Sequence, residues 1–165
     1  MNNSKAIVFD AYGTLFDVNS AAEKSKDKIG NKWENFANFW RTTQLEYTWL
    51  RSLMKKHKNF WQITEDSLDK SMETFQIDTS LRNDLLSLYK KLSPYPEVKN
   101  VLENLKNKSF KLAILSNGTP ELLNYLVKSS DLENLFDDIF SVEEVKIYKP
   151  DPKVYDIAVN KYKVS

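Results

Sequence analysis

Apolar residues along this chain follow two different patterns. Residues 6–9 and 112–115 are uninterrupted apolar runs, and each is followed directly by a polar residue. Short runs of this kind predict strands that are buried on both faces, as in a parallel sheet. A weaker run predicts a third strand over residues 136–142.

Between and after these strands, apolar residues recur at helical spacing. Residues 98–105 predict one helix, and Pro120 opens a second. Asp151 followed by Pro152 is typical of a helix start, with the aspartate as N-cap. Strands that alternate with helices in this order predict an α/β fold with a doubly wound parallel sheet.

A long segment from about residue 20 to residue 92 contains helical patterns only. Its longest predicted helix is marked by residues at helical spacing: Trp33, Phe36, Ala37, Trp40, Gln44, Tyr47 and Met54. Further helices are predicted over residues 60–75 and 81–92. An all-helical block of about 70 residues is large enough to form a small domain.

Pro94 and Pro96 mark the end of this block, because proline clusters interrupt regular structure. We therefore expect an all-helical cap at residues 18–92. The α/β core would then consist of residues 1–17 and 93–165, with the cap inserted after the first strand.

The composition narrows the possible partners. The 24 basic and 23 acidic residues nearly cancel, so no net field favours nucleic acid or an acidic membrane surface. The chain has no cysteine, which excludes disulfides and thiolate chemistry. No apolar run approaches the roughly 20 residues of a spanning helix, and Met1–Ser4 has no apolar signal-peptide core. We therefore expect a cytoplasmic protein without nucleic-acid or membrane partners.

Residues that could take part in catalysis lie where the predicted strands end. Asp10 follows the first strand directly, and Ser116, Asn117 and Gly118 follow the second. Lys149 lies in a later loop on the same side. Ligands of open parallel sheets bind in the crevice outside the carboxyl ends of the strands. A carboxylate, a hydroxyl beside a glycine turn and an ammonium group form a coherent set for covalent catalysis.

Four segments resemble the motifs of one family. Phe9–Asp17 resembles the first motif of the haloacid dehalogenase superfamily, Leu115–Gly118 the second and Tyr148–Asp151 the third. Trp40–Arg41 and Gln44–Met54 resemble the L-2-haloacid dehalogenases in particular. The motifs occur in order, and the resemblance covers nearly the whole chain.

The resemblance implies a mechanism in which Asp10 attacks C2 of a short L-2-haloalkanoate. Halide leaves, the carbon inverts, and water hydrolyses the resulting aspartyl ester to a D-2-hydroxy acid. Lys149 would keep Asp10 ionised, because a nearby ammonium favours the charged form of a carboxylate. Arg41, reaching down from the cap, would receive the halide, and Thr14 would support the nucleophile loop.

The resemblance also implies a binding site. Ser116 and the backbone at Asn117 would hold the substrate carboxylate, and Tyr155 would anchor Lys149. The apolar wall around the alkyl group would consist of Tyr12, Leu45 and Phe60. This branch uses no metal and no cofactor, and its members often form homodimers.

Tyr12 separates the branches of the superfamily. In the superfamily that the chain resembles, the phosphatases carry a second aspartate at this position, where it protonates the leaving alkoxide. Tyrosine, with an unperturbed pKa of about 10, cannot do this efficiently near neutral pH. A halide needs no proton, so Tyr12 favours carbon–halogen chemistry over magnesium-dependent phosphoryl transfer.

Each residue also has a plain structural interpretation. Asp10 alone could be a loop cap, Ser116–Gly118 a simple turn, and Lys149 a solvated surface residue. Arg41 could extend over apolar neighbours on a helix margin. The tryptophans at 33, 40, 49 and 61 are most simply cap core. His57, flanked by lysines, is expected to be solvated and to have no role.

The family pattern continues beyond Ser165 with another core strand and a loop bearing Ser, Asn and Asp near the nucleophile. We therefore expect one edge of the nucleophile strand to be exposed, which invites pairing with another chain. Three interpretations stay open. They are a dehalogenase, a shortened and non-catalytic remnant of one, and, least favoured, a magnesium-dependent phosphatase.

Overall fold

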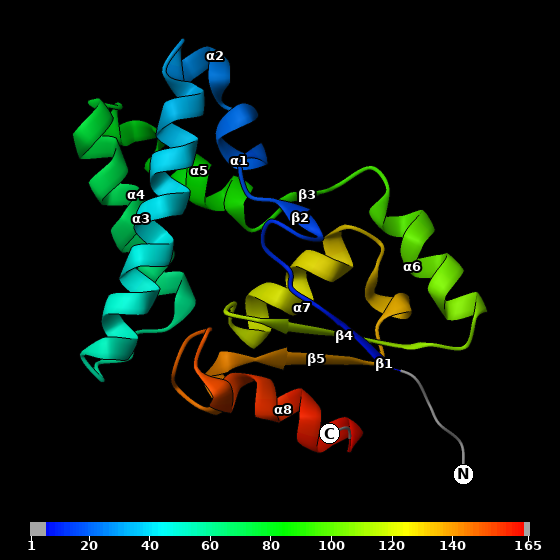
Figure 1. The fold of residues 1–165 in the computed structure, drawn as a ribbon. Helices are drawn as coiled ribbons and strands as arrows, with labels where there is room; N and C mark the ends of the chain where they lie inside the picture. Colours follow the sequence, from blue (N-terminus) through cyan, green and yellow to red (C-terminus); the bar gives the residue numbers. More distant parts are fainter. Residues whose placement is uncertain (1–5, 164–165) are drawn as a thin grey trace.

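The computed structural model describes residues 6–163 and contains a three-stranded parallel sheet (Figure 1). Its strands are β1 (Ala6–Phe9), β4 (Lys111–Ser116) and β5 (Asp138–Ser141), in the order β1-β4-β5. The three predicted strands are therefore confirmed. Met1–Ser4, on which the expectation about a signal peptide rests, lies outside the described residues.

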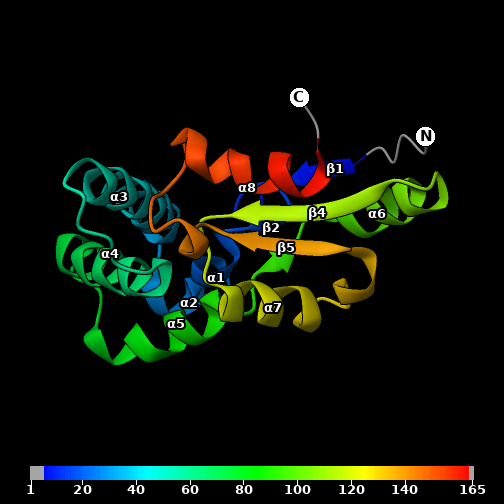
Figure 2. The same cartoon turned by 90° about the horizontal axis from the view of Figure 1, so that it is seen from below.

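Three helices cover the two faces of this sheet. They are α6 (Val98–Asn107), α7 (Pro120–Ser129) and α8 (Pro152–Tyr162). Helices α6 and α7 lie on one side of the strands and α8 on the other (Figures 1 and 2). This arrangement confirms the predicted doubly wound α/β fold. The predicted helix start is also present, since the Asp151 side chain accepts a hydrogen bond from the Lys153 amide, and Pro152 comes first in α8.

The helical block lies beyond one end of the sheet, as Figure 1 shows. Its helices are α1 (Ser20–Glu23), α2 (Lys26–Ile29), α3 (Trp33–Leu53), α4 (Phe60–Phe75) and α5 (Arg82–Tyr89), and the 3-10 turn η1 (Thr79–Leu81) precedes α5. Helices α3 and α4 pack along one another. All five helices fall inside the expected cap range, while the division at residues 18–92 stays a prediction.

A two-stranded antiparallel ribbon joins the two parts of the molecule. Strand β2 (Phe16–Asp17) leaves the sheet layer and pairs with β3 (Ser93–Pro94), where the chain returns. The Ser20 hydroxyl reinforces the junction by donating to the Asp17 carbonyl at 2.8 Å and accepting from the Ser93 amide at 3.1 Å. Two-residue strands give no periodic signal, so the sequence pattern did not indicate this ribbon.

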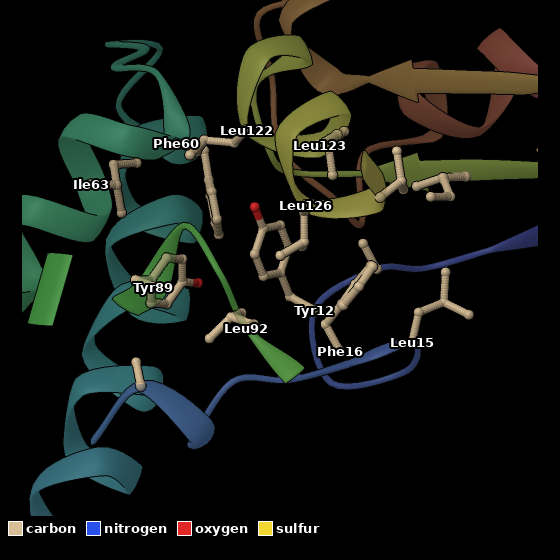
Figure 3. Packing of buried hydrophobic residues seen from close by; sticks show 14 of the residues in the cluster. Tyr12, Leu15, Phe16, Phe60, Ile63, Tyr89, Leu92, Leu122, Leu123 and Leu126 are labelled. Carbon is tan, nitrogen blue, oxygen red and sulfur yellow. The ribbon is translucent and has the colours of Figure 1, made fainter. Parts of the chain in front are cut away.

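Buried aromatic residues make the core continuous between the two parts. Figure 3 shows the Tyr12 ring lying between Phe60 and Tyr89 of the helical block on one side and Leu126 of α7 on the other. The ring centroids of Tyr12 and Phe60 are 5.0 Å apart, and those of Tyr12 and Tyr89 are 5.8 Å apart. Aromatic contacts at these distances add stabilisation beyond area burial. Tyr12 therefore fixes the cap against the sheet layer.

The expectation that all four tryptophans form cap core is wrong for Trp49. Trp40 is buried, and its indole N–H donates to the Thr64 carbonyl at 3.1 Å. Trp33 and Trp61 are half-buried. Trp49, in contrast, is 47% exposed, because it lies on the side of α3 that faces a cavity.

Strand β1 is an edge strand within the described part of the chain. Its only partner there is β4, and Val8 on it is exposed. An apolar groove runs beside this edge, lined in part by Val8, Leu115 and Val159. Apolar groups therefore face solvent along the free edge.

The two later strands are tied together at their starts by Asp137. Its carboxylate accepts from the Leu112 amide at 2.8 Å and from the Lys106 ammonium at 3.0 Å. The hydrogen bond from Leu112 is the main reason that the pKa of Asp137 lies below its usual value, and Lys106 lowers it further. The ionised carboxylate therefore stabilises the folded state.

We expect Asp137→Asn to lower the free energy of unfolding by about 1 kcal/mol at pH 7, because a charge-assisted bond becomes a neutral one. The Asp137 pKa is depressed by folding, so the stabilisation is complete above the unfolded value of about 4 and disappears as pH falls through the folded-state pKa. Urea unfolding across this pH range measures the difference. Asp156→Asn, an exposed position on α8, is the control, and a deficit that persists at low pH would contradict the prediction.

Candidate active site

A cavity of about 450 Å³ lies between the helical block and the carboxyl ends of β1 and β4. Eight of the ten residues predicted for the site line it: Asp10, Tyr12, Arg41, Leu45, Phe60, Ser116, Asn117 and Lys149. Trp49 and Pro150 complete the lining. Residues that are more than a hundred positions apart therefore meet in one pocket.

Asp10 and Lys149 form an ion pair at the floor of the cavity. The Lys149 Nζ lies 2.8 Å from Asp10 Oδ1 and also donates to the carbonyl of Leu115. The lysine side chain is largely buried, while the Asp10 carboxylate is more open to solvent. Two fixed acceptors hold the ammonium in place, which leaves Asp10 Oδ2 outside this pair and available for chemistry.

Arg41 enters the cavity from α3 and is held at two of its nitrogens. Nη1 donates to Gln44 Oε1 at 2.9 Å, and Nη2 donates to the Tyr12 carbonyl at 3.0 Å. Gln44 is itself buried and donates to Thr64 Oγ1 at 2.7 Å. A guanidinium carries five N–H donors, so Arg41 keeps donors for an anion in the cavity.

Tyr12 forms a wall that stays uncharged. Burial raises the pKa of its hydroxyl well above the usual value, and the nearby Tyr89 raises it further, whereas Arg41 lowers it. A hydroxyl with so high a pKa is a poor proton donor to a leaving group. Tyr12 therefore provides a neutral surface beside Asp10.

Ser116 and Asn117 lie at the end of β4 and use acceptors, not donors, in their contacts. Ser116 Oγ accepts from the Gly118 amide at 3.2 Å, and Asn117 Oδ1 accepts from the Lys149 amide at 3.2 Å. Among residues 6–163, no hydrogen bond uses the serine proton or the Asn117 side-chain NH₂. The end of β4 can therefore offer donors to a carboxylate.

Two predicted site residues lie outside the cavity lining. Thr14 is exposed in the turn after Asp10, where its amide donates to the Ala11 carbonyl. Tyr155 is 45% exposed and lines the groove beside β1. The expected anchoring of Lys149 by Tyr155 is not seen, because the ammonium donates to Asp10 and Leu115 and no described hydrogen bond joins it to Tyr155.

The expectation that His57 is solvated is wrong. Its side chain is only 17% exposed, and Nε2 lies 3.0 Å from Glu143 Oε1. The neighbouring lysines suggested a solvated segment, but Glu143 comes from a distant part of the chain. No periodic pattern in the sequence indicated this contact.

The described residues contain no cluster of three or more His, Asp or Glu side chains that could hold a metal ion. Within the same residues, every helix is too short or too polar to cross a membrane.

A family model for haloacid dehalogenase-like hydrolases matches residues 4–165. The chain belongs to this family.

Several relatives of this hydrolase are named as dehalogenases. (S)-2-haloacid dehalogenase 1 of Pseudomonas sp. (strain CBS-3) is 45% identical over 166 residues, which cover 99% of this chain and 73% of that protein. (S)-2-haloacid dehalogenase 4A of Burkholderia cepacia is 41% identical, over 100% of this chain and 72% of that protein. The predicted family and its dehalogenase branch are therefore confirmed.

Solved structures agree with the fold of this hydrolase. A dehalogenase crystal structure superimposes with a TM-score of 0.95 at 41% identity, over 100% of this chain and 74% of that one. L-2-haloacid dehalogenase from Xanthobacter autotrophicus with chloropropionic acid covalently bound gives 0.88 at 38% identity, over 98% of this chain and 66% of that one. The helical cap and parallel sheet are thus shared with dehalogenases.

Trp49 is a cavity residue of this hydrolase that the sequence reasoning missed. It follows Leu45 by four positions on α3, and residues at this spacing share one helix face. Leu45 had been assigned to the cavity wall, so the same face could have identified Trp49. Its partly exposed ring lines the cavity together with Leu45.

Gly118 lets Tyr12 approach the end of β4. A Cβ atom at this position would lie 2.9 Å from Tyr12 Cε2 and 3.0 Å from Leu123 Cδ2. Both neighbours are buried, so neither can move away freely. A side chain here would displace the cavity wall.

We expect Gly118→Ala to lower the free energy of unfolding by about 1–3 kcal/mol, because overpacking forces buried side chains off their preferred positions. Urea unfolding measures the change. In the double variant with Leu123→Ala, part of the crowding is relieved, so its loss should be smaller than the sum of the two single losses. Wild-type stability of Gly118→Ala would show that the close approach is not required.

Proposed function

We propose that this hydrolase dehalogenates short L-2-haloalkanoates to D-2-hydroxy acids through an ester on Asp10. The observation that carries the proposal is the cavity itself. The Asp10 carboxylate, which is paired with Lys149, and the Arg41 guanidinium, which has unused N–H donors, line the same pocket as several apolar side chains. The relative from Xanthobacter autotrophicus, with chloropropionic acid covalently bound, supports covalent chemistry in such a pocket.

In the first step an Asp10 carboxylate oxygen attacks C2 of the substrate from the side opposite the halogen. The new C–O bond forms as the carbon–halogen bond breaks, and the halide leaves with the bonding electrons. No proton is transferred, which suits a site whose neighbouring hydroxyl, Tyr12, is a poor acid. Lys149, whose ammonium lies 2.8 Å from Asp10 Oδ1, holds the carboxylate in place for this attack.

The substrate is oriented by its two polar ends. Donors at Ser116 and Asn117 hold the carboxylate, and the unused N–H groups of Arg41 stabilise the halide as its charge develops. Leu45 and Phe60 contact the alkyl group. With the carboxylate and halogen held at fixed places, Asp10 can reach C2 from one face only, which makes the reaction enantioselective.

In the second step water adds to the Asp10 ester carbonyl, and the acyl C–O bond breaks. The hydroxy acid leaves with an oxygen that belonged to Asp10. The water supplies the replacement oxygen and the proton of the product hydroxyl, and its second proton is released to solvent as Asp10 returns to the carboxylate. A general base would assist this attack. Among the described residues that line the cavity, Asp10 carries the only carboxylate. The alternative is a chain that forms the ester but releases it slowly.

Magnesium-dependent phosphoryl transfer is the less favoured alternative. It requires a proton donor for the alkoxide, and the residue two positions after Asp10 is Tyr12, whose pKa is raised by burial. A homodimer stays a prediction that light scattering of the purified chain can test.

We expect the purified chain to release halide from L-2-chloropropionate and to spare the D-enantiomer, without a requirement for magnesium. Arg41→Lys should lower the rate of halide release at least about tenfold, because lysine lacks the planar fork that is fixed to Gln44 and Tyr12. Ion chromatography of halide measures both effects. Thr42→Ala, an exposed neighbour on α3, is the control. Phosphate release from p-nitrophenyl phosphate that requires magnesium, with no halide release, would contradict the proposal.

We also expect incubation with L-2-chloropropionate to add one carboxyethyl group to the chain, because ester formation needs no general base and hydrolysis does. Intact-mass analysis detects the adduct, and peptide mapping should place it on Asp10. Asp10→Asn should show neither adduct nor halide release. A persistent adduct without turnover identifies the ester-forming alternative, whereas an adduct on another residue would remove Asp10 from the mechanism.

A further inference from the structure

A second contact between cap and core lies beside the cavity. His57, in the loop between α3 and α4, meets Glu143 of the 3-10 turn η3 (Val142–Glu144), which follows β5. The His57 Nε2 lies 3.0 Å from Glu143 Oε1 and 3.1 Å from Oε2. Both side chains are shielded from water, with 17% and 14% exposed. This contact spans 86 positions of the chain.

The charge state of Glu143 decides which side chain donates the hydrogen bond between His57 and Glu143. Burial alone would raise the pKa of Glu143, but hydrogen bonds from Lys146 and His57 outweigh it and lower the pKa. Glu143 is therefore ionised at neutral pH and can only accept, so His57 Nε2 carries the proton. The other ring nitrogen, Nδ1, is buried without a hydrogen-bond partner in the described residues.

Tyr148 is held by the cap beside this pair. Its ring stacks on His57 with centroids 5.2 Å apart and an interplanar angle of 29°. Its hydroxyl donates to the Lys58 carbonyl, and its amide donates to Ser52 Oγ at 3.1 Å. Ser52, His57 and Lys58 all belong to the helical block, and Tyr148 is almost fully buried among them. Three contacts with the cap therefore hold Tyr148 of the core loop in place.

Tyr148 directly precedes Lys149, which lines the cavity. Lys149 donates its amide to Asn117 Oδ1 and its ammonium to Asp10 Oδ1. A shift of Tyr148 would move the Lys149 backbone with it, because the two share a peptide unit. The placement of the ammonium thus depends on contacts made by the cap.

We propose that His57 and Glu143 are positioning residues that act through Tyr148 on Lys149. Their hydrogen bond, named here the cap latch, holds the loop over residues 146–150 against the cap. The expected effect of the cap latch on turnover rests on the proposed function. Its expected effect on the position of Tyr148 and Lys149 does not depend on any activity of the chain.

Hydrogen exchange of the full chain tests the structural part. Glu143→Gln weakens the latch, and His57→Phe removes it but keeps a ring to stack on Tyr148. Both should speed exchange of the Tyr148 and Lys149 amides about tenfold, as expected for the loss of one charge-assisted hydrogen bond. Amides of β4 should be unchanged and report that each variant is folded.

Lys146→Ala is the matched control. Lys146 also pairs with Glu143, at 2.9 Å, but it is 65% exposed and belongs to the core side of the latch. Its loss should leave exchange at Tyr148 and Lys149 at the wild-type rate. Equal acceleration in Lys146→Ala, or wild-type exchange in both latch variants, would overturn the proposal whether or not the chain releases halide.

Halide release then tests the functional part. Each latch variant should lower kcat about three- to tenfold with a smaller change in KM, because the substrate-binding side chains are untouched. The double variant should lose no more than the more affected single variant, since the two residues form one contact. Faster exchange with unchanged kcat would overturn the role in positioning Lys149. Absence of halide release in the wild type would instead count against the proposed function alone.

Discussion

The parallel pairing of β1 with β4 is the constraint on which the site depends. Phe9 lies opposite Ile114, so the carboxyl ends of both strands lie at the same end of the sheet. Asp10 and Ser116 therefore emerge side by side, although the helical block and α6 separate them in sequence. Parallel strands place their carboxyl ends together, which is why such edges collect ligands and catalytic groups. The Leu115 carbonyl at this edge then gives the Lys149 ammonium its second acceptor.

The helical block covers the carboxyl ends of β1 and β4 and encloses the cavity with them. Arg41 reaches across to the Tyr12 carbonyl, and Phe60 and Tyr89 pack on the Tyr12 ring. These contacts make Tyr12 both a structural joint and a wall of the cavity. The antiparallel ribbon of β2 and β3 pairs the two segments in which the chain crosses between the sheet layer and the cap. Stability and site geometry thus share the same residues.

Much of the site was predictable because its residues stand at recognisable places in the sequence. Asp10 and Ser116 follow buried strands, and Lys149 lies in a motif before a capped helix. Thr14 and Tyr155 were placed by motif alone, and the structure puts both outside the cavity lining. Trp49 was assigned to the core because an aromatic side chain on an amphipathic helix gives the same signal in a core as in a cavity wall. His57 was assigned to solvent because local charge says nothing about a distant partner.

The sequence by itself determined the order of strands and helices, the inserted helical segment and the residues at the strand ends. These features follow from local periodicity and turn chemistry, which neighbouring residues define. Only the tertiary structure decided which side chains share the cavity, how Arg41 is held and how His57 meets Glu143. Such contacts join residues tens of positions apart, and their geometry depends on the packing of whole elements, which no local pattern encodes.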